Sequence, residues 1–450
     1  MKNLYSFITC TFIIFGYCFG SITPLTTTLG TRVVSVATIV RYYSTETTRD
    51  TYLGANESAI HTVARCQAWR DSVASSTYPN TTVTWAFSWD ALNALDGEYP
   101  AIRELVKGYV NQYGDDFSFN PSGDFAPMYN SQNQTNKDLH DALSLISDIV
   151  GGGYRPKSII GGYLGAESLK YLAEIEDIHV AQATIFSQYK VDYGDGDGGS
   201  PYPYYPSLQH YLRPAQDETE AIDIVVLDGW TVDFLAARRV AGGVGFNSRM
   251  GVGPLETIGA LGPDLGAQEQ LHTSSIHFTT GFALNNEAFL TNIWEICLQI
   301  DVQYMTKWLN AVHALWPDSV CVKHGDYGLS WRDTHRSNDF NYSFVEIGSG
   351  IHGSDADKEI TFYVNKAFRL VLIRDLISPG IGQVIDFTRY DVPAQEPAAD
   401  SPLTRSWNLM NEINWKQDRG SQDTPRALSE LSADNIALIV SWLPQLKNFV

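Results

Sequence analysis

The sequence predicts an α/β protein built on a parallel barrel, followed by a β-rich region and a final helix. Segments with strand and helix patterns alternate over roughly 280 residues, which is typical of a parallel α/β architecture. The predicted strands are apolar almost throughout, so we expect both faces of the sheet to be covered. No G-x-G-x-x-G follows the first strand, and this favours a barrel over an open nucleotide-binding sheet.

The elements follow from local patterns. The run 33–40 is rich in β-branched and apolar residues, as expected of a buried strand. Gly151 to Gly153 mark the end of the amphipathic helix that precedes them. We expect strands at 33–40, 82–87, 158–162, 179–185, 221–227 and 275–279. We expect helices at 57–72, 100–113, 137–150, 166–176, 232–239 and 287–308.

Three regions are expected along the chain. Residues 1–20 have the charge and apolar order of a signal peptide, with Lys2 before an apolar run that is too short to span a bilayer. The barrel is expected over 21–316. Short alternating runs then predict a β-rich accessory region over 317–450, which includes a Pro/Ala-rich connector and a last helix at about 429–443.

These features predict a secreted protein. Four N-x-[ST] triplets are consistent with a glycoprotein, at Asn56, Asn80, Asn133 and Asn341. After removal of the leader three cysteines remain, and this odd number implies a free thiol or an intermolecular bond, with Cys297 and Cys321 as the favoured intramolecular pair.

The composition disfavours some classes of binding partner and favours carbohydrate. The formal net charge of −20 makes nucleic acid and anionic membrane surfaces unfavourable partners. The chain carries 11 Trp, 24 Tyr and 20 Phe, often beside Gly, Asn, Asp and Pro, which suits sugars that stack on rings. The motifs of serine esterases, P-loop nucleotidases, zincins and thiol oxidoreductases do not occur.

Asp228 is the leading candidate for a catalytic carboxylate. It follows the apolar strand 221–227, and active sites of parallel barrels lie at the carboxyl ends of the strands. Trp230 could provide a platform for a sugar ring. Asp233 falls in the first turn of the next helix, where a negative charge is also favourable without any function.

Asp90 and Glu167 are the candidates for a second carboxylate. Trp89 and Asp90 follow the strand 82–87, although Asp90 could instead cap the next helix. Glu167 follows the strand 158–162, with Tyr163 as a ring for stacking, or it is an ordinary first-turn glutamate. Glycosidic hydrolysis needs two carboxyl groups across the bond, so Asp228 could act with either one.

Metal binding is an alternative. His272 and His277 are the one close histidine pair, and with Asp228 they could hold a divalent metal if the chain bends between them. On a strand, their spacing would place them on opposite faces. Arg249 lies in a glycine-rich stretch and could contact a hydroxyl or an anion.

Six motifs together resemble a bacterial family known from Bacteroides-type proteins, which is similar to the glycoside hydrolase/deacetylase superfamily. The motifs are TWAFSWDAL (84–92), GGGYRPKSIIGGYLGA (151–166), DGDGG with YPYYPS (195–207), VVLDGWTVDFLAAR (225–238), NSRMGVGPLET (247–257) and HTSSIHF (272–278). The resemblance implies a distorted (β/α)7 barrel with a sugar-processing site at the strand ends. The superfamily's deacetylases carry an acidic pair on the first strand and H-[ST]-x-x-H, whereas this strand ends in Val40-Arg41 and these histidines are one residue too far apart.

The sequence therefore predicts a secreted glycoside hydrolase that needs no cofactor and acts on carbohydrate through paired carboxylates. A metal-dependent carbohydrate deacetylase is the second hypothesis. A carbohydrate-binding protein without catalysis is the third.

Overall fold

The computed structural model describes residues 31–47, 52–121, 126–186, 190–191, 194–195, 198–229, 233–237, 258, 261–351, 354–377, 380–397, 409 and 425–450. The predicted signal peptide lies outside these residues. In the part of the chain that is described, no helix is long and apolar enough to cross a membrane.

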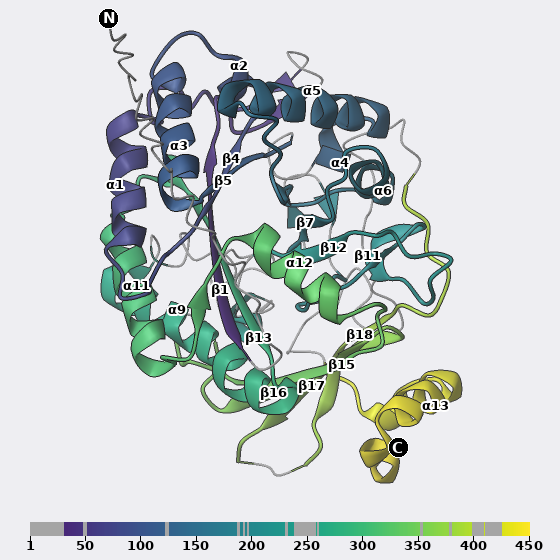
Figure 1. Cartoon of the computed structure of the whole chain (residues 1–450). Helices are drawn as coiled ribbons and strands as arrows, with labels where there is room; N and C mark the ends of the chain where they lie inside the picture. The colour runs from purple at the N-terminus through teal and green to yellow at the C-terminus, as the bar shows by residue number, and fades with distance from the viewer. Residues whose placement is uncertain are drawn as a thin grey trace, which may run out of the picture.

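The central strand is β1 (Arg32–Val40), which is buried along almost its whole length (Figure 1). It pairs in parallel with β13 (Ala288–Glu295) from Arg32 to Ile39. Its other edge pairs with β14 (Val320–Cys321) near the start and with β4 (Thr84–Phe87) near the end. β5 (Asp116–Phe119) then pairs in parallel with β4.

A second parallel sheet holds β6 (Ile159–Ile160), β7 (Val180–Thr184) and β12 (Val225–Asp228). Two side chains join it to the first sheet across β5 and β6. Ser118 Oγ donates to the carbonyl of Ser158 at 2.6 Å, and Asn120 Nδ2 donates to that of Ile160 at 3.0 Å.

The strand order is therefore β13-β1-β4-β5-β6-β7-β12, with the short β14 beside β1. Side-chain hydrogen bonds join β5 to β6, so the barrel is distorted at that point. The predicted fold class, a distorted (β/α)7-type parallel barrel, is confirmed.

Helices cover the strands. They include α1 (Val63–Ala74), α3 (Tyr99–Tyr113), α5 (Gln132–Val150), α6 (Ala166–Glu174) and α11 (Gln303–Leu315). Local signals set their ends: Thr62 caps α1 and Ser131 caps α5 through side-chain oxygens, and Gly114 ends α3 with a φ of 74°. In Figure 1, α1 and α11 lie side by side along the barrel.

The predictions for residues 275–308 were wrong. The expected strand 275–279 is helical, as α9 (Pro263–Ser275) continues into the π-helix Ile276–Gly281. The expected helix 287–308 instead begins with β13. A short, fully buried apolar run is locally ambiguous between strand and helix, and here pairing along β1 decides the outcome.

The cysteine prediction was also wrong. Cys66, Cys297 and Cys321 are all free thiols. Cys321 is buried on β14, whereas the Cys297 sulfur lies 3.1 Å from Nη2 of Arg41. The core is therefore held by packing and ion pairs rather than by a disulfide.

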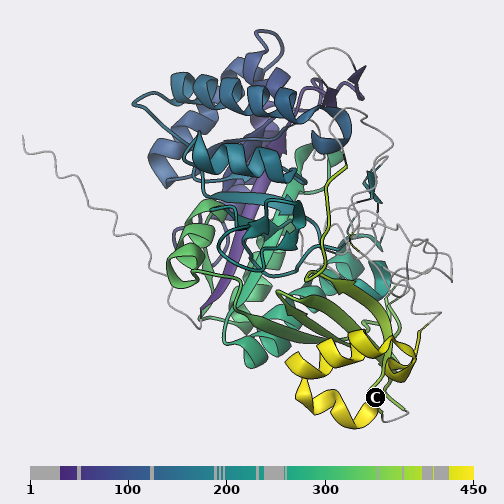
Figure 2. The ribbon, with the colours of Figure 1, turned by 90° about the vertical axis from the view of Figure 1, so that its right-hand side faces the viewer.

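The β-rich C-terminal region is confirmed as an antiparallel sheet. Its strands are β15 (Asn341–Ile347), β16 (Lys358–Asn365), β17 (Phe368–Asp375) and β18 (Gln383–Arg389). The last helix, α13 (Ala433–Trp442), packs on this sheet below the barrel (Figure 2). β14 and α12 (His324–Thr334) come after residue 316 yet pack on the barrel, so the barrel-associated chain extends past that expected boundary.

A buried arginine fastens the C-terminal sheet to the barrel. Arg369 forms an ion pair with Asp386 inside the sheet, and both side chains are fully buried. Its Nη1 donates to the carbonyls of Phe186 and Gly199, both at 2.8 Å. Phe186 follows β7, so this guanidinium joins backbone carbonyls of the barrel to a carboxylate of the C-terminal sheet.

We predict that Arg369→Met destabilises the protein by about 3–5 kcal/mol, because Asp386 would remain buried without a counter-charge. Arg374→Met is the matched control. It removes an ion pair with Glu359 at the surface and should cost no more than about 1 kcal/mol. Urea unfolding measures both, and equal losses would contradict the structural role of Arg369.

Candidate active site

Two strands bring polar side chains to the mouth of the barrel. β1 and β4 are neighbours and run in parallel, so their carboxyl ends lie at the same edge. Arg41 and Tyr42 follow β1, and Ser88 and Asp90 follow β4. This edge is where parallel barrels carry their active sites.

Ser88 connects the two strand ends. It is the N-cap of α2 (Trp89–Asn93), and its Oγ accepts the N–H of Tyr42 at 3.2 Å. The same hydroxyl donates to Oε1 of Glu46 at 2.6 Å. Oε2 of Glu46 accepts the N–H of Asp90 at 3.0 Å, so both carboxyl oxygens of Glu46 are held by the β4–α2 junction.

Glu46 is the most perturbed carboxyl at this edge. It is 5% exposed. Burial, and then the negative charge of Asp90, raise the pKa of Glu46 to about 7, against the opposing effect of its hydrogen bonds. A buried carboxyl that retains its proton up to neutral pH, beside a second carboxyl, is the environment in which acid–base chemistry occurs.

A cavity of about 230 Å³ opens beside this pair. We call it the mouth cavity, and it is lined by Tyr42, Tyr43, Asp90, Asn93, Ala94 and Asp96. The Tyr42 hydroxyl donates to Oδ2 of Asp96 at 2.8 Å, and its ring stacks on that of Tyr99 with centroids 5.1 Å apart. The cavity therefore combines two carboxylates with two aromatic rings.

Arg41 anchors the loop that carries the tyrosines. Its Nε and Nη2 donate to the two carboxyl oxygens of Glu57 at 3.0 and 3.2 Å, and Nη2 also donates to Oε2 of Glu295 at 3.0 Å. Glu295 is the last residue of β13. The arginine at the end of β1 is thus a structural cation, and it fixes the segment between β1 and α1 against a neighbouring strand.

Asp228 does not join Asp90 in the mouth cavity. It ends β12, is 5% exposed, and its Oδ1 accepts the N–H of Phe186 at 2.9 Å. In the strand order, β5, β6 and β7 stand between β4 and β12. This hydrogen bond connects the end of β12 to the residues that follow β7.

We predict that Asp228→Ala costs about 1–3 kcal/mol of stability, because the buried N–H of Phe186 loses its acceptor. Asp228→Asn should cost less, since the amide oxygen can still accept. Thermal unfolding of both variants measures the difference. Equal losses in the two variants would contradict this role.

Glu167 and Tyr163 do not line the mouth cavity either. Glu167 is exposed in the first turn of α6, where its charge favours the helix N-terminus. The same N-terminus receives Glu396 from the connector, whose Oε1 accepts the N–H of Ala166 at 2.7 Å. Tyr163 is fully buried and packs edge-on against Tyr211, so its ring has no exposed face for a sugar.

Trp89 is half-buried beside Asp90, at the start of α2. The predicted sugar platform Trp230 and the predicted ligand contact Arg249 lie outside the described residues.

The histidines lie on a helix, and the expected strand is absent there. His277 is buried between the rings of Tyr202 and Phe344, and burial lowers its pKa to about 4. Within the described ranges, no three His, Cys, Asp or Glu side chains are arranged as ligands of one metal ion. The alternative set of His272, His277 and Asp228 is therefore not assembled here.

Asp233 belongs to a buried cluster of three carboxyls. As expected for a helix N-terminus, its Oδ1 accepts a backbone N–H of α7 (Phe234–Ala237) at 2.8 Å. Glu346 of β15 accepts two more N–H groups of α7 at 3.1 and 3.2 Å. Glu269 of α9 completes the cluster, and it and Glu346 hydrogen-bond to Asp233. Two carboxyl groups can hydrogen-bond to each other only if one of them carries a proton.

Burial, followed by the charge of Asp233, raises the pKa of Glu269 to about 10. The folded protein therefore keeps a proton that the unfolded chain releases above about pH 4.5. This stabilisation is complete below that pH and is lost as the pH rises towards 10, by up to about 1.4 kcal/mol per pH unit.

We predict that Glu269→Gln, whose amide is neutral and still donates, has a shallower fall in stability between pH 6 and pH 9. Urea unfolding at several pH values measures the slopes. Identical slopes in the two proteins would show that Glu269 is ionised in the folded state.

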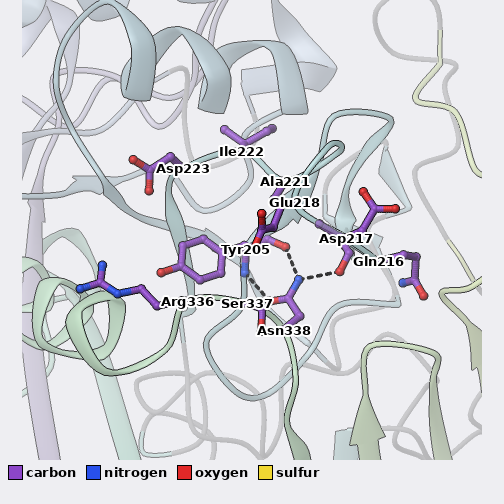
Figure 3. Close-up of a pocket in the computed structure, with 11 residues that line it drawn as sticks. Tyr205, Gln216, Asp217, Glu218, Ala221, Ile222, Asp223, Arg336, Ser337 and Asn338 are labelled. Atoms are coloured by element: carbon purple, nitrogen blue, oxygen red, sulfur yellow. Dashed lines mark hydrogen bonds between the residues drawn. The ribbon is translucent and has the colours of Figure 1, made fainter.

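A second cavity lies at the other end of β12. It has a volume of about 220 Å³, and Figure 3 shows Tyr205, Asp223, Arg336 and Asn338 among its lining residues. Asn338 is held by hydrogen bonds to the backbone of Tyr205 and Ala215, drawn as dashed lines. Asp223 lies two residues before Val225, the first residue of β12, so this cavity lies at the amino end of the strand, away from the edge where barrel chemistry occurs.

Comparison with known proteins agrees with the fold and with the resemblance seen in the sequence. A solved protein from Parabacteroides distasonis, provisionally assigned as a glycoside hydrolase/deacetylase, is 40% identical with a TM-score of 0.87, over 94% of this chain and 100% of that one. A probable polysaccharide deacetylase from Pseudomonas aeruginosa matches at 12% identity and a TM-score of 0.41, over 68% of this chain and 92% of that one.

A branching enzyme of the GH57 type from Pyrococcus horikoshii matches at 8% identity and a TM-score of 0.39, over 66% of this chain and 70% of that one. No curated protein matches the chain significantly. Two family models match, both described as domains of unknown function with a solved structure: DUF3863 over residues 26–364 and DUF3864 over residues 369–446. The chain therefore belongs to the DUF3863 family and carries a DUF3864 domain at its C-terminal end.

Proposed function

We propose that this protein is a glycoside hydrolase whose reaction takes place in the mouth cavity. The observation that carries the proposal is the contact of Glu46, from the loop after β1, with the backbone of Asp90 after β4, beside a cavity lined by two tyrosines. A sugar ring can stack on Tyr42 or Tyr43 while carboxylates bind its hydroxyls. The provisional assignment of the Parabacteroides relative supports a carbohydrate substrate.

We assign the acid role to Glu46 and Asp90 as a pair. The charge of Asp90 contributes to the raised pKa of Glu46, so Glu46 retains its proton beside Asp90 up to about pH 7. Asp90 is the member that lines the cavity, and it presents the proton to the glycosidic oxygen. Glu46 is a positioning residue that holds the proton behind it.

Asp96 is the second carboxylate of the mouth cavity. The hydrogen bond from Tyr42 holds one of its oxygens, and we assign to this carboxylate the attack on the sugar or the activation of a water molecule. This pairing replaces the expected pairs of Asp228 with Asp90 or Glu167.

We also propose that the protein acts outside the cytosol. The signal-like segment 1–20 supports export. The four sequon asparagines, Asn56, Asn80, Asn133 and Asn341, are all exposed, as glycosylated positions must be.

The test compares Asp90→Asn, Glu46→Gln and Asp148→Asn on a panel of oligosaccharides, with release of reducing ends as the readout. Asp148 is an exposed carboxylate on α5 and controls for the loss of one charge. We expect Asp90→Asn to lower kcat/KM by at least about 100-fold, the usual contribution of a general acid, and the control to stay at the wild-type value.

The pH profile separates Glu46 from a residue with a merely structural role. Activity of the wild type should fall as the pH rises through about 7, because the pair loses its proton. In Glu46→Gln the like charge beside Asp90 is gone, so this fall should move to lower pH. Full activity of Asp90→Asn on a confirmed substrate would contradict the assignment of Asp90 as the proton donor.

Deacetylation is the second candidate, because the assignment of the Parabacteroides relative names both reactions. Assaying acetate beside reducing ends distinguishes the two. Acetate release without new reducing ends would favour a deacetylase over a glycoside hydrolase.

A further inference from the structure

We infer that the two tyrosines of the mouth cavity have different roles: Tyr43 binds the substrate and recognises one of its hydroxyl groups, whereas Tyr42 is a positioning residue for Asp96. The inference rests on the proposed function, because it concerns substrate recognition in the same cavity. It follows from which groups of the two side chains are already engaged by the protein.

The Tyr42 side chain is engaged on its ring and on its hydroxyl. The ring stacks on that of Tyr99, with centroids 5.1 Å apart and planes at 20°. The hydroxyl donates to Oδ2 of Asp96 at 2.8 Å, and it also forms a hydrogen bond with Ser58. One face of the ring is therefore covered, and the proton of the hydroxyl is committed to a carboxylate of the protein.

These contacts make Tyr42 a support for Asp96. Tyr99 is buried on α3, and its hydroxyl donates to the carbonyl of Arg41 at 2.7 Å, so the surface on which Tyr42 stacks is itself held in place. The hydrogen bond to Asp96 raises the pKa of Tyr42, so the hydroxyl remains a donor to that carboxylate. Tyr42 thus acts on the reaction through the orientation of Asp96.

Tyr43 differs from Tyr42 in its hydroxyl and in its ring. It is half-buried and lines the cavity, and its ring meets that of Tyr42 at a tilt of 40°, with centroids 4.9 Å apart. In the described part of the chain, the Tyr43 hydroxyl has no hydrogen-bond partner. It can therefore both donate to and accept from a ligand.

The backbone of Tyr43 is fixed although its hydroxyl is free. Its N–H donates to the carboxyl group of Glu46, and it forms an antiparallel bridge with Asn56. The N–H of Ser44 continues this pairing with the carbonyl of Ala55 at 2.9 Å. A ring on a segment that is held before binding loses little conformational entropy when a ligand arrives, which favours binding.

A tyrosine with a free hydroxyl can recognise a sugar in two ways. Its ring packs on the apolar face of the sugar, and its hydroxyl hydrogen-bonds to a hydroxyl at the edge of the sugar ring. A site built to hydrogen-bond a substrate hydroxyl discriminates against the analogue that lacks it. We therefore expect Tyr43 to contribute to affinity and to specificity.

The first experiment compares Tyr43→Phe, Tyr42→Phe and Tyr113→Phe on the oligosaccharide of the panel that the wild type hydrolyses fastest. Tyr113 is 39% exposed on α3 and is not among the residues that line the cavity, so it controls for the loss of one hydroxyl. Tyr43→Phe should raise KM by about two- to tenfold, the effect of one neutral hydrogen bond, with kcat near the wild-type value.

Tyr42→Phe should instead lower kcat by about tenfold with a smaller change in KM, because Asp96 loses the donor that orients it. In the Asp96→Asn background, Tyr42→Phe should cause no further loss, since the hydroxyl acts through that carboxylate. A merely structural role of Tyr42 would give the same loss in both backgrounds. Tyr113→Phe should match the wild type in kcat and in KM.

The second experiment uses monodeoxy analogues of the same oligosaccharide. For one analogue, the wild type should have a kcat/KM about two- to tenfold below that for the parent sugar. Tyr43→Phe should hydrolyse this analogue and the parent sugar equally well. Tyr113→Phe should discriminate between them as the wild type does.

Three results would overturn the inference: an unchanged KM in Tyr43→Phe, an unchanged kcat in Tyr42→Phe, or discrimination among the analogues that Tyr43→Phe retains in full. If any of them occurs while Asp90→Asn still lowers hydrolysis, the roles of the tyrosines are wrong and the proposed function stands.

The proposed function fails on its own if Asp90→Asn is fully active or if no oligosaccharide of the panel is cleaved. Calorimetry of the panel with the wild type and with Tyr43→Ala then decides the inference. Weaker binding to Tyr43→Ala supports a ligand contact at Tyr43, whereas equal affinities, or no binding to either protein, overturn it.

Discussion

Parallel pairing of β1 with β13 on one edge and with β4 on the other places three strand ends side by side. The chemistry of the barrel mouth depends on this constraint. Glu295 at the end of β13 reaches Arg41 at the end of β1, and Ser88 at the end of β4 reaches the loop that follows β1. Without this register, Glu46 would have neither the hydrogen bonds that position it nor the neighbour that perturbs it.

Buried charge serves two purposes in this chain. At the mouth, Arg41 is neutralised by two glutamates and holds a loop in place, and Arg369 with Asp386 fastens the C-terminal sheet to the chain after β7. These ions are paired and hydrogen-bonded, as burial requires. Glu46 differs from them, because its charge has no counter-ion among its described contacts and its pKa rises instead. That difference separates a structural charge from a candidate catalytic one.

Much of the fold could be predicted from the sequence because the barrel strands are short apolar runs between clear stops. β1, β4 and β7 fall where their patterns place them. β13 could not be recognised, since AFLTNIWE is buried at every position and its polar residues do not alternate with apolar ones, so its local pattern does not separate a buried strand from a buried helix. Only its partner β1 decides between them.

Of the site proposed here, the sequence suggested Asp90 but not Glu46. Asp90 could be found because it follows a strand that is easy to recognise. Glu46 lies in β2 (Glu46–Thr47), a two-residue strand within a polar loop, and nothing local distinguishes it from a solvent-exposed glutamate. Its role depends on contacts with Ser88 and Asp90, more than forty positions away. Asp228 has the right place on its strand, but its described hydrogen bond goes to the end of β7.

The most direct test of the account is a titration of the Glu46 carboxyl, followed by carbon-13 NMR in the wild type and in Asp90→Asn. The account predicts a midpoint near pH 7 in the wild type. In Asp90→Asn the midpoint should be lower, because the neighbouring negative charge is removed while the burial remains. A midpoint near 4.5 in both proteins would show that Glu46 is an ordinary carboxylate, and would contradict a proton-holding pair at the barrel mouth.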